Sequence, residues 1–352
     1  MPTATPGAKS AIDLRSDTVT LPTPAMRAAM AAAPVGDDQY GEDPTINLLQ
    51  DQLATLLGKQ AALWLPSGTM ANQVALRTLT RPGDEVVVSR ECHAGWHEAG
   101  GSAANAGVQL KEIGQRGVFS VQEFVAAIKP RTWQIFPPTT LVEIENTHNR
   151  AGGVVFPQAE VRRICELARA TGIASFLDGA RLWNAAVQCG LAPARLAAPF
   201  DLVMAAFSKG LGAPAGSMLA GPKDLIASAA RHRRMLGGAM RQVGMFAAAC
   251  DHALTHNLAR LAEDHANARL IAERLAGCRG VTMRLERLMT NIVVFELEGG
   301  CLTAAQLVAA ARESGVLINA FSPVKVRLVT HLDVSRADCL RAAEVIAAML
   351  DG

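Results

Sequence analysis

The chain has 352 residues, of which half are hydrophobic and 19% are charged, a composition typical of a globular protein and not of a disordered one. Its formal net charge of +2 and its mixed charge pattern argue against a nucleic-acid-binding or membrane-binding surface. No stretch approaches the roughly 20 apolar residues that span a bilayer, and Met1–Lys9 lacks the apolar core of a signal peptide. Seven scattered cysteines without a CxxC spacing indicate reduced thiols, so we expect a cytoplasmic protein without a metal site.

Helices and strands alternate over the first two thirds of the chain. The polar segment 13–20 is unlike a core strand, and helices are predicted over 26–33 and after the acidic turn 36–44, where Asp43 or Thr45 is the expected cap. Further strands are predicted at 61–65, 85–89, 108–113, 140–145, 173–177 and 202–207. Further helices are predicted at 70–78, 121–128, 157–171 and 223–233. This alternation predicts an α/β domain whose mainly parallel sheet is covered on both faces.

The pattern changes after about Gln242. An Ala/Leu-rich stretch, 245–275, is suited to linking two domains. Short strands at 290–297, 316–319 and 326–330 then accompany helices at 303–314 and 335–349. We therefore divide the chain into an N-terminal segment (1–50), a large α/β domain (51–245) and a small α+β C-terminal domain (246–352).

One lysine stands where a buried strand meets a glycine-rich turn. The apolar run 202–207 predicts the strand, and Ser208-Lys209-Gly210 follows it directly. A lysine in this place loses hydration, which lowers the pKa of its amine and favours a nucleophile or a Schiff-base former. The alternative is a lysine whose ammonium group reaches water beyond the strand end. The role of Lys209 therefore depends on its partners.

Asp178 closes the predicted strand that precedes the Lys209 strand. A carboxylate in such a place is costly unless it meets a cation or a strong donor. The pyridine nitrogen of pyridoxal phosphate is such a cation, because a facing carboxylate keeps it protonated. In a parallel sheet, Asp178 and Lys209 would both point into the crevice at the carboxyl ends of the strands.

Three other strand ends carry polar residues that suit the same site. The turn Ser67-Gly68-Thr69 opens a helix whose free amides could bind a phosphate, although many such turns serve only as caps. His93 follows the second strand, and its ring could stack on a cofactor or be an ordinary loop histidine. The segment 145–149, Glu-Asn-Thr-His-Asn, follows a further strand, where packing does not require polar residues.

Together these segments resemble the low-specificity L-threonine aldolases, a family of β-eliminating lyases. The resemblance covers roughly residues 12–350 and rests on 14–20, 35–38, 40–44, 66–72, 145–149, 177–181, 208–214, 240–242 and 327–331. It implies the aspartate-aminotransferase-like fold, which is fold type I of the pyridoxal-phosphate enzymes, with a mainly parallel seven-stranded sheet in the large domain. It also implies pyridoxal phosphate as the cofactor, a small β-hydroxy-α-amino acid as the substrate, and a homotetramer built as a dimer of dimers.

The resemblance also assigns roles to individual residues. Lys209 would hold the cofactor as a Schiff base, Asp178 would pair with the pyridine nitrogen, and His93 would stack on the ring. The other implied contacts are Gly68 and Thr69 with the phosphate, Arg181 with the cofactor and the substrate carboxylate, Ser16 and Arg327 with that carboxylate, His148 near the β-hydroxyl, Arg234 and Arg241 near a phosphate that often belongs to a neighbouring subunit, and Tyr40 at the border of the site. Trp96 and His97 depart from the family pattern, which leaves the preferred aldehyde open.

The implied reaction is the retro-aldol cleavage of L-threonine, L-allo-threonine and related amino acids to glycine and an aldehyde. The base that removes the β-hydroxyl proton stays open between His93, His148 and a water that they hold. The alternatives are another reaction on the same fold, namely β-elimination, transamination or serine hydroxymethyl transfer, and a non-catalytic ligand-binding protein. A dinucleotide-binding protein is disfavoured because no GxGxxG follows the first strand.

Overall fold

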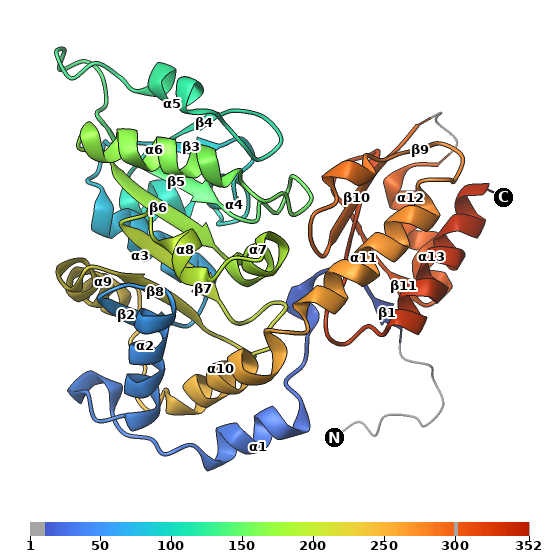
Figure 1. Ribbon diagram of the computed structural model, residues 1–352, viewed down its shortest axis with the longest axis horizontal. Coiled ribbons are helices and arrows are strands. Elements are labelled where there is room, and N and C mark those ends of the chain that lie inside the picture. The colour runs from blue at the N-terminus through green and yellow to red at the C-terminus, as the bar shows by residue number, and fades with distance from the viewer. Residues whose placement is uncertain (1–10, 299–301, 352) are drawn as a thin grey trace. The chain divides into compact units, whose positions relative to one another are not determined.

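A computed structural model describes residues 11–298 and 302–351 of the chain (Figure 1). These residues form two compact units. The larger unit is Thr20–Ala262, and the smaller unit combines the described part of Met1–Val19 with that of Glu263–Gly352. Met1–Lys9, where we predicted no signal peptide, and Cys301 lie outside the described residues.

The larger unit is built on a seven-stranded sheet in the order β2-β8-β7-β6-β5-β3-β4. The strands are β2 (Ala61–Leu65), β3 (Glu85–Ser89), β4 (Gln109–Ile113), β5 (Thr139–Glu145), β6 (Ala174–Gly179), β7 (Leu202–Ala206) and β8 (Ser217–Gly221). Every pairing from β7 to β4 is parallel, whereas β8 is antiparallel to both of its neighbours. Six strands therefore run in one direction and only β8 is reversed, which confirms the predicted mainly parallel sheet.

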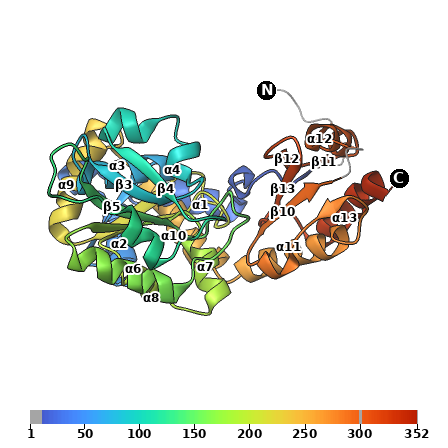
Figure 2. The ribbon, with the colours of Figure 1, turned by 90° about the horizontal axis from the view of Figure 1, so that it is seen from above.

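Helices cover both faces of this sheet (Figure 2). On one face, α3 (Gly68–Leu79) and α9 (Lys223–Met235) share a buried apolar cluster with alternate residues of the strands. On the other face lie α6 (Gln158–Ala170), α7 (Leu182–Cys189) and α8 (Pro193–Ala197), and α5 (Val121–Ala127) packs against α6. Apart from the edge strand β4, which is largely exposed, the strands are buried along nearly their whole length, as expected for a sheet that is covered twice.

Three helices from distant parts of the sequence pack together at the β2 side of the larger unit (Figure 1). They are α1 (Pro24–Ala32), α2 (Pro44–Leu56) and α10 (Gly244–Asn257). The carboxylate of Asp43, which is buried, joins two of them: it caps α2 by accepting from the Ile46 amide at 3.1 Å, and it accepts from the Gly244 amide at the start of α10 at 2.9 Å. Of the two predicted caps of this helix, Asp43 and Thr45, the structure shows that Asp43 is the cap. Between α1 and α2 lies the short 3-10 helix η2 (Asp38–Tyr40).

The smaller unit is an α+β structure with its own apolar core. An antiparallel sheet runs in the order β12-β13-β10-β9, with strands Asn319–Ala320, Lys325–Val329, Ile292–Leu297 and Val281–Thr282. A separate parallel pair joins β1 (Ile12–Asp13) to β11 (Val316–Leu317). The helices α11 (Leu261–Leu275), α12 (Ala304–Glu313) and α13 (Arg336–Asp351) contribute residues to the core.

The structure differs from the sequence prediction in several elements, among them helices α7 and α8, which were not predicted. Strand β8 was not predicted, and β1 forms at the start of a segment that we judged unlike a strand, where Leu14 is fully buried. The stretch 245–275 is two helices, because α10 ends at Asn257, whose side-chain amide donates to the Leu211 carbonyl at 2.8 Å. The compact units divide at 19/20 and 262/263, whereas our domain boundaries at 50/51 and 245/246 fall within α2 and α10.

The described cysteines are all free thiols. Burial raises the pKa of the Cys165 thiol to about 12, and it raises that of Cys250 equally far. Such thiols pack as small apolar side chains and are poor nucleophiles at neutral pH. Within the described residues, no helix is both long enough and apolar enough to cross a membrane.

Candidate active site

The predicted site residues of the larger unit gather at one edge of its sheet. Strands β2, β3, β5, β6 and β7 share one direction, so their carboxyl ends lie at the same edge. Ligands bind in the crevice outside this edge in open α/β sheets. The residues at these five ends are Gly68, His93, His148, Asp178 and Lys209.

Asp178 is a fully buried carboxylate on β6. Its Oδ2 accepts a hydrogen bond from Asn72 Nδ2 at 2.8 Å, and its Oδ1 accepts one from the Ala180 amide at 3.0 Å. Burial raises the pKa of Asp178, as does the charge of Glu145, while the charges of His93 and Lys209 lower it; the net shift is upward. Two neutral donors only partly offset the burial, so a protonated pyridine nitrogen is a fitting partner for this carboxylate.

Lys209 follows β7 within the turn Phe207–Ala213. Its side chain is half buried, and its charge acts on Asp178. Two hydrogen bonds fix the backbone there, because the Lys209 carbonyl accepts from the Gly212 amide at 2.8 Å and from Thr20 Oγ1 at 3.2 Å. The turn therefore holds a primary amine near the carboxylate that a pyridine ring would require.

The amino end of α3 offers backbone amides for an anion. Ser67 caps the helix by accepting from the Met70 amide at 3.2 Å, and the helix geometry leaves the first amides, those of Gly68 and Thr69, without an acceptor inside the helix. A Cβ at Gly68 would lie 3.6 Å from Ser217 Oγ, a fully buried hydroxyl that has no hydrogen-bond partner among the described residues. These donors suit the phosphate group of pyridoxal phosphate.

His93 opens the short helix α4 (His93–Trp96) and is held at two points. Its backbone amide donates to Glu145 Oε2 at 2.8 Å, and its ring Nδ1 lies 2.8 Å from Glu98 Oε1. Burial lowers the pKa of His93, but the hydrogen bond to Glu98 and the charges of Asp178, Glu145 and Glu98 raise it more, so that the net shift is upward. The ring keeps a quarter of its side chain exposed, as a ring that stacks on a ligand requires.

His148 is buried, and its ring lies between the Ala151 amide and the carboxylate of Glu145. Its Nδ1 accepts from the Ala151 amide at 3.2 Å, and its Nε2 lies 3.6 Å from Glu145 Oε2 without a hydrogen bond to any described residue. Glu145 is fully enclosed: burial raises its pKa, but the electrostatic interaction with the nearby His148 ring and the hydrogen bonds from the amides of Asn149 and His93 lower it by more, and the net shift is downward. The downward shift favours a charged Glu145, which accepts from the His93 amide and lies beside the His148 ring.

Two buried groups beneath the site have raised pKa values, which favour their neutral forms. Glu143 lies two residues before Glu145 on β5. Neither of its carboxylate oxygens has a hydrogen-bond partner among the described residues. Burial, together with the charges of Asp178, Glu98 and Glu145, raises the pKa of Glu143 well above its ordinary value. Burial, with the charge of Glu145 as a smaller cause, likewise raises the pKa of the Cys92 thiol. Cys92 is therefore an unsuitable nucleophile despite its place beside His93.

The predicted carboxylate ligands are divided between the two units. In the larger unit, the buried Arg181 donates from Nη1 to Asn149 Oδ1 at 3.3 Å. In the smaller unit, Arg327 on β13 donates from Nη2 to the Arg15 carbonyl at 3.0 Å, so it lies next to Ser16 in the fold. The guanidinium of Arg327 also lies 4.4 Å from the centre of the Phe321 ring. Within the smaller unit, Arg327 therefore lies near the backbone that leads into Ser16.

Tyr40, Arg234 and Arg241 meet at an exposed surface. Arg234 Nη1 donates to Gln39 Oε1 at 2.9 Å, and Arg241 Nη1 donates to the same oxygen. Tyr40 follows Gln39 and is 71% exposed. Of the basic cluster 231–234, only Arg233 is buried, and it pairs with Asp38 at 2.8 Å within the chain. Arg231 and Arg234 are exposed, and His232 is partly buried against Arg77.

Arg150 packs on the loop that carries Trp96 and His97, the residues that depart from the family pattern. The Arg150 guanidinium lies 4.2 Å from the centre of the exposed Trp96 ring and donates to Glu91 Oε1 at 2.9 Å. The His97 ring lies 5.4 Å from that of His93. Trp96 and His97 are therefore ordered parts of the surroundings of His93.

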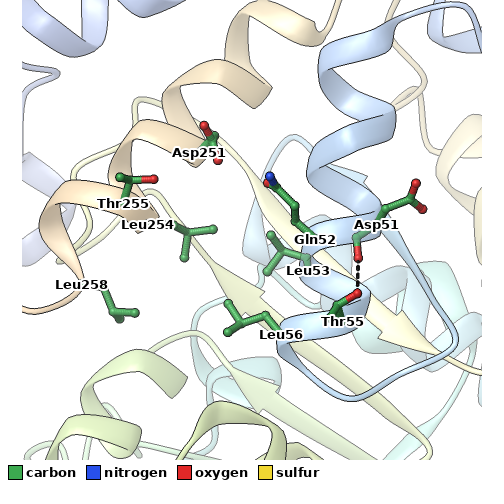
Figure 3. Close-up of a pocket in the computed structure, with 9 residues that line it drawn as sticks. All are labelled: Asp51, Gln52, Leu53, Thr55, Leu56, Asp251, Leu254, Thr255 and Leu258. Carbon is green, nitrogen blue, oxygen red and sulfur yellow. Dashed lines mark hydrogen bonds between the residues drawn. The ribbon is translucent and has the colours of Figure 1, made fainter.

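A cavity elsewhere on the larger unit has no part in this site. It lies between α2 and α10, has a volume of about 640 Å³, and is lined mainly by leucines and threonines of these helices (Figure 3). Figure 3 shows Leu53, Leu56, Leu254 and Leu258 around its apolar wall. None of its lining residues belongs to the strand ends described above.

Sequence reasoning missed the residues that connect Asp178 to His93. Asn72 Nδ2 donates both to Asp178 Oδ2 and to Glu98 Oε1, the latter at 2.7 Å, and Gln73 Nε2 donates to Glu98 Oε2 at 2.6 Å. One ring nitrogen of His93 and one carboxylate oxygen each of Glu98 and Asp178 all lie within 4.8 Å of one another. An acid five residues after His93, in a turn rich in glycine, was the available signal for Glu98.

The fold is shared with proteins of known structure. The solved structure of Leishmania major threonine aldolase superposes with a TM-score of 0.82 at 20% sequence identity, over 96% of this chain and 99% of that one. The predicted fold class is confirmed: the chain has the fold of type I pyridoxal-phosphate enzymes.

Sequence comparison defines the family. The β-eliminating lyase family matches residues 13–298, and the chain belongs to this family. The chain is 45% identical over 334 residues to the low-specificity L-threonine aldolase of Escherichia coli K12, covering 94% of this chain and 97% of the relative. It is 38% identical over 332 residues to the low-specificity L-threonine aldolase 1 of Arabidopsis thaliana, covering 93% of each. The predicted resemblance is confirmed.

Proposed function

We propose that this protein is a pyridoxal-phosphate-dependent lyase that cleaves L-threonine, L-allo-threonine and related β-hydroxy-α-amino acids to glycine and an aldehyde. The observation that carries the proposal is the meeting of Lys209, Asp178 and the Gly68–Thr69 amides at one sheet edge. These groups match the aldehyde, the pyridine nitrogen and the phosphate of the cofactor in chemistry. The relation to low-specificity L-threonine aldolases over nearly the whole chain supports the choice of reaction.

Each residue has a proposed task in this reaction. Lys209 binds the cofactor covalently through Nζ, Asp178 keeps the pyridine nitrogen protonated, and His93 stacks on the ring. Bound pyridoxal phosphate supplies the electron sink for the pair that is released when the Cα–Cβ bond breaks. The Gly68 and Thr69 amides bind the phosphate.

The substrate contacts follow from charge and hydrogen-bonding capacity. Arg181 in the larger unit, and Ser16 and Arg327 in the smaller unit, bind the substrate carboxylate, because a guanidinium holds a carboxylate with paired hydrogen bonds. A fixed carboxylate orients the substrate so that the bond to be broken is aligned for reaction. His148 lies near the β-hydroxyl, and the proton of that hydroxyl passes to His93, to His148 or to a water that they hold.

β-Elimination is the second candidate reaction, because the family description itself names it. We expect incubation with L-threonine and phenylserine to give glycine with acetaldehyde and benzaldehyde respectively. A β-eliminating enzyme would instead release ammonia and a 2-oxo acid from threonine or from an amino acid with a good leaving group at Cβ. Ammonia and a 2-oxo acid in place of glycine and aldehyde would contradict the aldolase assignment.

We further propose a cytoplasmic homotetramer, a dimer of dimers. The free thiols support a reducing compartment. The exposed Tyr40 and the pair Arg234 and Arg241, which converge on the exposed Gln39, support a subunit interface at which these residues border the neighbouring site. In this arrangement Arg234 and Arg241 lie near the cofactor phosphate of the adjacent subunit.

Mixing two inactive variants tests the shared site. Lys209→Ala should be inactive, and Arg241→Ala should bind the cofactor weakly because a cation beside its phosphate is lost. If Arg241 serves the neighbouring subunit, hybrid dimers contain one intact site, so an equal co-expressed mixture should recover roughly a quarter of the wild-type sites on random pairing. An activity of the mixture equal to the mean of the two variants would show that Arg241 does not serve a neighbouring site.

A further inference from the structure

The two histidines of the site are held through their Nδ1 atoms in opposite senses. In His148, Nδ1 receives a hydrogen bond from the Ala151 backbone amide at 3.2 Å. A backbone amide can only donate, so this Nδ1 carries a lone pair and the proton of the neutral ring lies on Nε2. In His93, Nδ1 lies 2.8 Å from a carboxylate oxygen of Glu98, which accepts. The proton of the neutral His93 ring therefore lies on Nδ1.

Glu98 is fixed as an acceptor by its other neighbours. Its side chain is fully buried, and both of its oxygens receive hydrogen bonds from amide groups, Asn72 Nδ2 at 2.7 Å and Gln73 Nε2 at 2.6 Å. The assignment of the Asn72 nitrogen is secured because the same nitrogen also donates to Asp178 at 2.8 Å, and an amide oxygen facing two carboxylates would be repelled. Asp178, Asn72, Glu98 and His93 thus form one continuous chain of hydrogen bonds.

We propose that Glu98 is a positioning residue that keeps the ring proton of His93 on Nδ1, so that His93 offers Nε2 as an acceptor while His148 offers Nε2–H as a donor. The inference rests on the proposed function, in which both histidines were candidates for the base. Only neutral His93 can then take up the β-hydroxyl proton, on Nε2. The electron pair of the O–H bond becomes the second bond of the aldehyde carbonyl, and the pair of the Cα–Cβ bond passes to the cofactor.

The acidic groups around His93 raise the pKa of its ring, which suits a residue that takes up a proton. The groups that face it are Glu98 at Nδ1, Glu145 at its backbone amide, Asp178 and the His97 ring. Burial lowers the pKa of His93, whereas Glu98, Asp178 and Glu145 raise it, with an upward net shift. Because Glu98 contributes both a hydrogen bond and a charge, its neutralisation should lower the pKa of His93.

The test uses Glu98→Gln, with Glu112→Gln as the matched control. Glutamine has one acceptor oxygen and cannot accept from His93, Asn72 and Gln73 together. Glu112 is an exposed acid on β4 whose carboxylate lies beside Gly95 of α4, and its substitution makes the same chemical change nearby while the hydrogen bond from His93 Nδ1 to Glu98 is kept. The pH midpoint of deuterium exchange at the His93 ring C2 carbon is measured by peptide mass spectrometry of the cofactor-loaded protein. All proteins carry His97→Asn, so that the peptide contains one histidine.

We expect the His93 midpoint to move to lower pH in Glu98→Gln and to stay in place in Glu112→Gln. The kcat for threonine should fall more than KM changes, and Glu98→Asp, which keeps the charge, should restore part of both properties. An unchanged His93 midpoint in Glu98→Gln would overturn the inference. This readout does not use turnover, so it distinguishes a failed role for Glu98 from a failed aldolase assignment, in which threonine would give no aldehyde.

A second measurement needs no variant of Glu98 and so does not depend on its folding. Solid-state ¹⁵N spectra of the full-length protein with labelled histidine report which ring nitrogen is protonated, and His93→Gln and His148→Gln assign the signals. At a pH where both rings are neutral, we expect a protonated Nδ1 in His93 and a protonated Nε2 in His148. The same tautomer in both rings would contradict the inference.

Discussion

Replacing Lys209 by alanine is expected to abolish turnover and to remove the visible absorbance of the bound cofactor. The side chain provides the amine that binds the cofactor covalently, and alanine offers no substitute. The turn itself should survive, because its backbone contacts to Gly212 and Thr20 do not involve the side chain. An absorbance spectrum and an aldehyde assay with threonine check both effects.

The matched control is Lys223→Ala, which removes an exposed lysine from the start of α9. This variant should keep both the colour and the activity of the wild-type protein. A coloured and active Lys209→Ala protein would show that the cofactor is held by another residue or not covalently at all.

Asp178→Asn is expected to retain part of the cofactor but to lose at least about a hundredfold in kcat, the scale associated with the loss of one preorganised electrostatic group. Asparagine keeps the shape of the side chain but cannot hold a proton on the pyridine nitrogen by charge. It also cannot accept as a carboxylate does from both the Asn72 amide and the Ala180 amide. Cofactor content by absorbance and kcat from the aldehyde assay separate binding from reaction.

Asp201→Asn is the control for this substitution. Asp201 is a partly buried carboxylate whose Oδ2 accepts from the Ser175 amide at 2.8 Å, at the amino ends of β6 and β7 and so at the opposite edge of the sheet. Its substitution should cost stability without a selective loss of kcat. Turnover like that of the wild type in Asp178→Asn would remove Asp178 from its proposed task.

The strand ends were predictable because their signal is local. A buried apolar run followed by a polar or glycine-rich turn marks the carboxyl end of a strand in an α/β domain, and this pattern located Gly68, His93, His148, Asp178 and Lys209. Parallel pairing then places these ends at one edge without further information. Strand β8 was not predicted because its sequence, Ser-Met-Leu-Ala-Gly, has an apolar run of only three residues between a serine and a glycine, and its reversal depends on its neighbours rather than on its own sequence.

The network behind the site was not predictable in the same way. The contact between Asn72 and Asp178 spans 106 residues, and that between His93 and Glu145 spans 52. No periodicity encodes such contacts, because they exist only after the sheet and α3 have packed. The tautomers of His93 and His148 follow from two shorter-range contacts, to Glu98 five residues later and to the Ala151 amide three residues later, whose geometry depends on the folded turns. The sequence therefore left the two histidines equivalent, whereas the structure distinguishes them.

The most direct test of the central claim is to map where the cofactor is attached. Reduction of the coloured protein with borohydride fixes a lysine-bound pyridoxal phosphate as a stable secondary amine, and peptide mass spectrometry then locates it. The structure predicts that the label lies on Lys209 and that reduction ends the cleavage of threonine. A label on another lysine, or an unlabelled protein that still releases acetaldehyde from threonine, would contradict the account.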